Sequence, residues 1–126
     1  MKYSRFEELP VWISAIEVTT KIYDITSRGS WSKDFGLRDQ IRRATVSISS
    51  NIVEGFEKNS TNELIRYLRI AKGSTGEVRN QLYIARNIGY VSTNLFEDLN
   101  DMFLKLGKEI GGFIRYLDTY RKSKAA

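Results

Sequence analysis

Cysteine and histidine are both absent from this chain of 126 residues, and proline occurs only once. Without thiolates and imidazoles, the chain lacks two common nucleophiles, the side chain that titrates near neutral pH, and the usual ligands of zinc. We therefore expect no metal, no cofactor and no catalysis that depends on these side chains. The lack of cysteine is also in keeping with a reducing compartment, so we expect a cytoplasmic protein.

Long apolar runs are missing as well. No stretch approaches the roughly 18 apolar residues that a membrane-spanning helix needs, so we expect no membrane partner. The stretch from Met1 to Glu17 carries Glu7 and Glu8 and does not resemble a signal peptide. No strict alternation of apolar and polar residues is sustained, which argues against β-strands.

Apolar residues instead recur at every third or fourth position along most of the chain, which is the period of one helix face. This pattern predicts four helices, at about residues 9–26, 35–57, 61–88 and 94–121, within a single domain that spans residues 1–126. Long helices joined by short loops pack antiparallel to their neighbours. The sequence therefore predicts an all-α fold, an antiparallel up-down-up-down left-handed four-helix bundle.

Local signals mark the ends of the predicted helices. Pro10 suits a first helical turn, where its missing N–H would have no partner in any case. Ser60 and Glu63 form a capping box before the third helix. Asn94 repeats this pattern before the fourth helix, with Ser92 as an alternative cap. The basic tail from Arg121 onward is expected to fray.

Polar residues interrupt the apolar seams of the second and third predicted helices. Asn51 falls on a seam position, and glycines and polar residues crowd the seam near residue 75. One interpretation is an acid-base site that uses Glu54 and Glu77. The other, which we favour, is a structural layer of hydrogen bonds and ion pairs that sets helix register or a subunit interface, with no enzymatic activity. The residues of this structural polar layer are Arg43, Asn51, Glu54, Ser74 and Glu77.

The net charge of +5 favours an acidic partner such as nucleic acid. Lys72, Arg79 and Arg86 recur every seven residues and should line up along the third helix. Guanidinium groups suit bidentate contacts to phosphate, in a mode that is largely independent of sequence. The alternative is a solvated surface with local ion pairs, and both interpretations stay open at this point. The candidate nucleic-acid-binding residues are Arg38, Arg42, Arg66, Arg69, Lys72, Arg79 and Arg86.

Aromatic residues allow two interpretations as well. Tyr3, Trp31 and Tyr90 could stack on bases or could pack at the ends of the bundle. Trp12, Tyr67 and Phe103 lie at or just beside the predicted seams and exceed what one narrow seam can bury. A subunit interface would bury them, so we expect a homo-oligomer.

One segment resembles a known family. The second helix contains Gly36-Leu37-Arg38-Asp39-Gln40-Ile41-Arg42-Arg43-Ala44, then Ser47-Ile48, then Asn51-Ile52-Val53-Glu54-Gly55. This resembles the hallmark segment of the 23S rRNA-intervening-sequence four-helix-bundle proteins. Ala71-x-Gly73-Ser74-x-x-Glu77 and Ile88-Gly89-Tyr90 are similar to the family as well. Two departures are Ser49, where the family often has proline, and the additional Gly76.

The resemblance implies an up-down-up-down bundle that assembles into a ring-shaped homopentamer, with no established enzymatic activity. The family is related in fold to the accessory variability protein of diversity-generating retroelements, which binds nucleic acid and a reverse transcriptase. Together with the charge, this implies a non-enzymatic, basic, homo-oligomeric scaffold that binds nucleic acid through phosphate contacts, RNA in preference to DNA. The alternative is an adaptor whose partner is another protein, for example a nucleic-acid enzyme.

Overall fold

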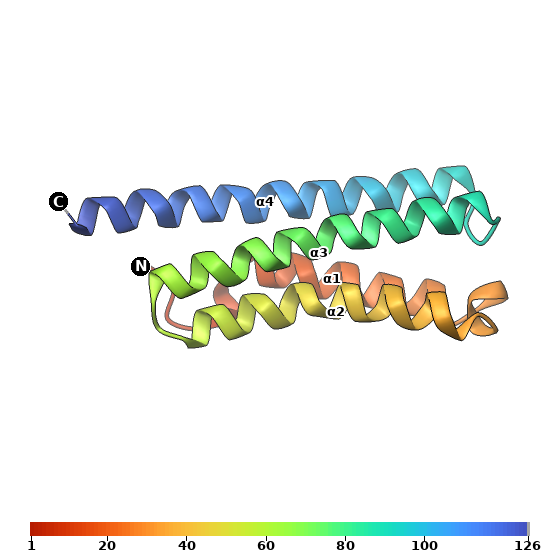
Figure 1. The fold of residues 1–126 in the computed structure, drawn as a ribbon, viewed down its shortest axis with the longest axis horizontal. Helices are drawn as coiled ribbons and strands as arrows, with labels where there is room; N and C mark the ends of the chain where they lie inside the picture. Colours follow the sequence, from red (N-terminus) through yellow and green to blue (C-terminus); the bar gives the residue numbers. More distant parts are fainter. Residues whose placement is uncertain (126) are drawn as a thin grey trace.

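The computed structural model describes the backbone of residues 1–125 and the side chains of residues 1–124. Four α-helices follow one another: α1 (Pro10–Thr26), α2 (Phe35–Glu57), α3 (Thr61–Asn87) and α4 (Thr93–Ala125). Two short 3₁₀ segments, η1 (Phe6–Glu8) and η2 (Gly29–Ser32), precede α1 and α2. Figure 1 shows that the chain reverses direction at each connection, so that consecutive helices run antiparallel. The fold is all-α, and the left-handed sense of the bundle stays a prediction.

Side chains that accept hydrogen bonds from the backbone define the helix starts. Asp34 and Ser60 each accept from the N–H three residues later, at 3.0 and 3.3 Å, at the starts of α2 and α3. Ser92 does the same at 3.1 Å for α4, so Ser92 is the cap and Asn94 already lies inside the helix. Pro10 is the first residue of α1, as predicted.

Within the described residues, α4 continues to Ala125, beyond the predicted end at about residue 121, whereas fraying of the C-terminal tail stays a prediction. Asp118 pairs with Arg121 one turn later and with Lys122 at 3.2 Å. These ion pairs connect successive turns, and the basic residues of the last turn face the negative end of the helix dipole. The pairs hold the pKa of Asp118 below its usual value, through the hydrogen bonds from Lys122 and then Arg121.

The core runs the length of the bundle, and the most extensive packing lies between α2 and α3 and between α3 and α4. Gly55 is buried where α2 meets α3. The close approach of the two helices favours glycine here, because a Cβ would lie 2.6 Å from Tyr67 Cβ. α2 continues without a break through Ser49, the position at which the family often has proline. The largest fully buried side chains are Leu9, Ile22, Ile41, Ile48, Ile52, Ile65, Leu68, Leu82, Leu99, Phe103, Leu106 and Ile110. Phe103 therefore belongs to the core of one subunit and is not available for an interface.

The aromatic residues at the two ends of the bundle pack within the chain. Trp31 is buried and meets Tyr90 edge-on with ring centroids 5.4 Å apart, and Tyr3 meets Phe113 in the same way at 6.1 Å. The hydroxyl of Tyr90 donates to Asp34 at 2.7 Å. The backbone N–H of Leu37 and then this hydroxyl lower the pKa of Asp34, while the pKa of Tyr90 is raised by the same hydrogen bond. The packing interpretation of Tyr3, Trp31 and Tyr90 is the one that these contacts support.

Candidate nucleic-acid interface

A shallow groove of about 340 Å³ lies between α3 and α4, the two helices that run side by side along the top of Figure 1. Four of its lining residues carry a positive charge and none carries a negative one. Its floor is formed by small and apolar residues. The lining residues are Lys72, Thr75, Gly76 and Arg79 from α3, and Phe103, Leu104, Gly107, Lys108, Gly111 and Arg115 from α4.

Two of these cations converge over Gly111. Lys72 Nζ lies 3.8 Å, and Arg115 Nη1 3.7 Å, from the position that a Cβ on Gly111 would occupy. No ion pair within 4 Å involves either side chain in the part of the chain that the structure describes. Two like charges 4 Å or more apart repel by only about 1 kcal/mol or less in water, so the helices can hold them near one another. An anion bound between the two cations would attract both of them, and these attractions would outweigh their mutual repulsion.

Arg79 is held in place by a neighbouring amide. Its Nε donates to Asn100 Oδ1 at 2.9 Å, across from α3 to α4. This bond uses one guanidinium donor and orients the plane of the group, while the terminal nitrogens make no hydrogen bond with the described residues. The exposed Lys108 lines the same groove on α4. A phosphate entering the groove would therefore meet positive groups on both walls.

Three further α3 residues from the predicted set lie outside the groove. Arg86 stacks over Phe96 and Tyr83, at 4.5 and 5.2 Å from the ring centroids. Arg66 donates to Glu63 at 2.7 Å, and this carboxylate raises the already high pKa of Arg66. Arg69 is exposed on the same helix. The regular spacing of Lys72, Arg79 and Arg86 is real, but the groove includes only the first two.

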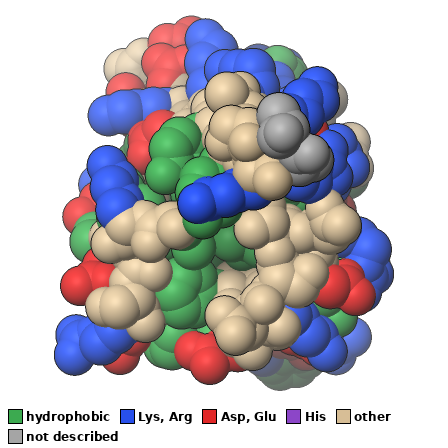
Figure 2. All heavy atoms as spheres, turned by 90° about the vertical axis from the view of Figure 1, so that its left-hand side faces the viewer, with side chains coloured by type: hydrophobic (Ala, Val, Ile, Leu, Met, Phe, Trp, Pro, Cys, Tyr) green, Lys and Arg blue, Asp and Glu red, His purple; other side chains and the backbone are tan. Residues whose placement is uncertain are grey.

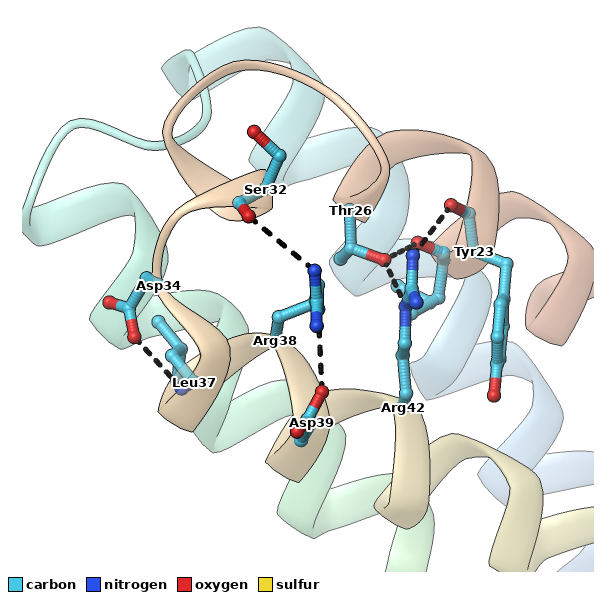
Figure 3. A network of polar contacts seen from close by, with 9 residues as sticks. Tyr23, Thr26, Ser32, Asp34, Leu37, Arg38, Asp39 and Arg42 are labelled. Atoms are coloured by element: carbon cyan, nitrogen blue, oxygen red, sulfur yellow. Dashed lines mark hydrogen bonds and ion pairs between the residues drawn. The ribbon is translucent and has the colours of Figure 1, made fainter.

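Arg38 and Arg42 are engaged at the junction of α1 and α2 (Figure 3). Arg42 donates to Thr26 Oγ1 at 2.8 Å and to the carbonyl of Tyr23 at 3.4 Å, and stacks on the Tyr23 ring at 4.4 Å. Arg38 donates to Asp39 at 3.3 Å and lies over the Phe35 ring at 4.7 Å. Arg42 thus joins the end of α1 to α2, and Arg38 joins the connection to α2 because its Nη1 also donates to the carbonyl of Ser32 at 3.5 Å. The structure does not bring them near the α3–α4 groove residues with which they were grouped.

The predicted polar layer forms only in part. Ser47 donates to Ser74 at 2.6 Å between α2 and α3, and Asn51 donates to the carbonyl of Ser47 at 2.7 Å. Tyr67 donates to Glu54 at 3.4 Å at the exposed margin.

The charged members of that layer do not meet. Arg43, Glu54 and Glu77 are exposed, and no ion pair joins them within the described residues. The helices approach through small residues at the seam, which places the long charged side chains at the margins in solvent. Within one subunit, these three residues therefore form no ion-pair layer, and a role for them at a subunit interface stays a prediction. Glu54 lines two surface hollows on α2, and Glu77 lines neither of them.

Lys108 and Arg115 are groove residues that the sequence analysis did not select. Their seven-residue separation matches that of Lys72 and Arg79. In antiparallel neighbours, two such patterns face one another across the seam. That repeated spacing was a signal in the sequence, but the pairing of α3 with α4 was needed to interpret it.

Within the described residues, no cluster of three or more potential metal ligands occurs. None of the helices is long and apolar enough to cross a membrane, judged over the same residues.

The family model described as 23S rRNA-intervening sequence protein matches residues 7–112. This chain belongs to that family. The match includes Lys72, Arg79 and Lys108, whereas Arg115 lies just beyond it. No curated protein matches the chain.

A similar solved structure supports the fold. It is a protein of unknown function from the S23 ribosomal protein family of Bacteroides thetaiotaomicron VPI-5482, with a TM-score of 0.78 and 24% identity. The match covers 83% of this chain and 95% of that one. At this level of identity, the likeness establishes the shared fold alone.

Proposed function

We propose that this member of the 23S rRNA-intervening sequence protein family is a non-enzymatic, homo-oligomeric scaffold that binds nucleic acid through phosphate contacts. The observation that carries this proposal is the α3–α4 groove, with four cations and no carboxylate among its lining residues. Phosphate oxygens are the acceptors that Lys and Arg side chains bind in nucleic acids. RNA is the preferred ligand because the family description refers to an rRNA.

The charge distribution at one end of the bundle supports the same ligand class. Figure 2 views the molecule from the end at which α4 finishes, and Lys and Arg side chains gather in its upper part, on the side of α4. Lys124 in the last turn of α4 adds positive charge beyond the groove, whereas Arg121 and Lys122 share the carboxylate of Asp118. A strand of nucleic acid lying along α4 would stay in contact with positive charge over several turns.

A salt titration tests this proposal. Binding of a fluorescent single-stranded RNA is measured by anisotropy over a range of salt concentrations. If the four groove cations neutralise between two and four phosphates, the slope of log K against log salt should lie between about −1.4 and about −3, from roughly −0.7 per phosphate on a single strand. Absence of binding at low salt, or binding that does not respond to salt, would refute the proposal.

Charge reversal identifies the surface involved. Lys72→Glu combined with Arg79→Glu should weaken binding to all RNA sequences alike and reduce the salt slope. Lys21→Glu combined with Lys105→Glu is the matched control, because it changes the net charge equally at exposed residues outside the groove. Equal losses in both variants would indicate a diffuse charge effect rather than this groove.

The exposed apolar residues of α1 support self-association as part of the proposal. Ile13, Ile16 and Tyr23 recur along one side of α1 and are 45%, 39% and 43% exposed. Burial of such a row between subunits is favourable by about 25 cal/mol per Å² of apolar surface. We expect light scattering to give an oligomer, in line with the pentamer that the family resemblance implies, and Ile16→Glu to shift it toward monomer. A wild-type monomer at micromolar concentration would count against this part of the proposal.

The same α1 row favours a second candidate function, an adaptor that binds another protein. A pull-down performed with and without nuclease separates the two candidates. A partner protein retained after nuclease treatment, and lost in Ile16→Glu, favours the adaptor. Loss of all partners on nuclease treatment favours nucleic-acid binding.

A further inference from the structure

We infer that the α3–α4 groove is built for a chain of phosphates, with two phosphate positions about 10 Å apart, rather than for a single phosphate group. This inference rests on the proposed function and specifies the ligand's form. The first position lies between Lys72 and Arg115 over Gly111, and the second lies at Arg79 with Lys108 on the opposite wall.

The first position is defined by glycines in α4. Arg115 Nη1 and Nη2 lie 3.7 and 3.8 Å from the Cβ positions of Gly111 and Gly112, so the guanidinium covers two residues that have no side chain. Lys72 Nζ reaches the same place from α3, 3.8 Å from the Cβ position of Gly111. The planar guanidinium of Arg115 and the ammonium of Lys72 converge over backbone that has no side chains, and together they can bind a tetrahedral anion.

The second position is defined by the oriented guanidinium of Arg79. Its Nε bond to Asn100 leaves the two terminal nitrogens for a ligand. A guanidinium that is already oriented loses less conformational freedom when it binds. The exposed Lys108 adds a second cation from the facing helix.

The separation of the two positions sets the minimum length of the ligand. Lys72 and Arg79 are seven residues apart on α3, as are Lys108 and Arg115 on α4, which corresponds to about 10 Å at 1.5 Å per residue. One phosphate group cannot contact the cations of both phosphate positions. Two phosphates on one chain can, and binding of the first raises the effective concentration of the second.

The floor between the two positions offers little for base recognition. It contains Leu104 and the buried Phe103, neither of which carries a side-chain hydrogen-bonding group. The third side chain, Thr75, is also buried, and its hydroxyl donates to the carbonyl of Lys72 at 2.6 Å. Contacts would therefore be to phosphates, and binding should be insensitive to base sequence. The shared ligand chemistry is a linear chain of phosphates, which a phosphodiester strand and inorganic polyphosphate both supply.

A ligand-length series tests the two positions. Inorganic phosphate, inorganic polyphosphate and single-stranded RNA oligonucleotides of increasing length are titrated by calorimetry. Affinity should rise by at least about tenfold once the chain can reach both phosphate positions, since each charge-assisted contact contributes about 1.5–3 kcal/mol. Equal affinity per site for inorganic phosphate and for the longest chains would overturn the inference.

Gly111 provides a matched pair of variants. Gly111→Asp places a carboxylate between Lys72 and Arg115, where it should act as an internal substitute for the ligand phosphate. Its Cβ would make ordinary contacts of 3.6 Å with Lys72 Cε and 3.7 Å with Arg115 Nη1. Gly111→Asn has nearly the same shape without the charge. We expect Gly111→Asp to lose about tenfold or more in RNA affinity, and Gly111→Asn to lose far less.

The outcomes separate this inference from the proposed function. Equal losses in the Asp and Asn variants would indicate a steric effect and overturn the inference. Salt-dependent RNA binding that neither variant changes would overturn the groove as the site and leave nucleic-acid binding intact. Polyphosphate binding that depends on Gly111, without any RNA binding, would support the groove and refute the proposed function. If Gly111→Asp does not fold, Lys72→Gln with Arg115→Gln should lower RNA affinity by about tenfold or more without altering the buried glycine, and unchanged affinity would overturn the inference.

Discussion

Replacing Gly55 by alanine should destabilise the protein, although alanine is the better helix former. An added Cβ would lie 2.6 Å from Tyr67 Cβ and 3.3 Å from both Cα and Cδ1 of Leu64. Tyr67 Cβ is attached directly to the α3 backbone and cannot rotate away. The substitution must therefore push α2 and α3 apart at the most extensive packing contact of the bundle.

The expected magnitude follows from two opposing terms. Overpacking that shifts backbone costs about 2–3 kcal/mol, at the upper part of the range for added methyl groups. Replacing glycine in a helix by alanine contributes about 1 kcal/mol in the opposite direction. The net loss should be about 1–2 kcal/mol, which corresponds to a fall in Tm of roughly 4–8 °C for a chain of this size.

Gly73→Ala is the matched control for the same chemical change. Gly73 lies inside α3, is exposed, and an added Cβ would meet nothing within 4 Å. Only the helix propensity changes there, so the free energy of unfolding of this variant should rise by up to about 1 kcal/mol. Urea denaturation followed by circular dichroism, at one fixed protein concentration, compares the two variants. A Gly55→Ala variant at least as stable as the wild type would refute the reasoning about helix contact.

Three further substitutions test local interactions. Tyr90→Phe should raise the pKa of Asp34 toward its ordinary value, measured by NMR titration, since one of the hydrogen bonds that lower it is lost. Because the folded pKa of Asp34 is depressed, the stability that this bond provides should be present near neutral pH and should disappear as the pH falls through that value. Arg42→Lys should cost about 1–2 kcal/mol in urea denaturation, because lysine keeps the charge but cannot make both hydrogen bonds to the end of α1. Ser92→Ala should cost about 1 kcal/mol through loss of the α4 cap, whereas Asn94→Ala, one residue inside the helix, should cost much less.

Helix positions could be predicted from the sequence because their signals are local. The apolar period, the single proline and the serine caps each act within a few residues, so the predicted starts lie within one residue of the observed ones. The end of α4 was the exception. The continuation to Ala125 is stabilised by the ion pairs of Asp118, and these matter only once the helix has already formed.

The candidate site was predicted less well, because side chains with the same charge have different roles in the folded protein. Arg42 and Arg79 both belonged to the set of phosphate-binding residues. The structure places Arg42 against Thr26 and the Tyr23 ring, and Arg79 in the open groove. No local property of the sequence separates these two arginines.

The sequence by itself determined the all-α class, the four helices and their order, and the family to which the chain belongs. These properties depend on local periodicity, capping and a continuous motif. Only the tertiary structure decided which charges gather on one surface. That depends on which helices are neighbours: α3 and α4 bring Lys72 beside Arg115 over Gly111, whereas the close contact of α2 and α3 at Gly55 leaves Glu54 and Glu77 at the margins. The sequence therefore determined that the protein is a basic helical bundle, and helix packing determined where its positive charges converge.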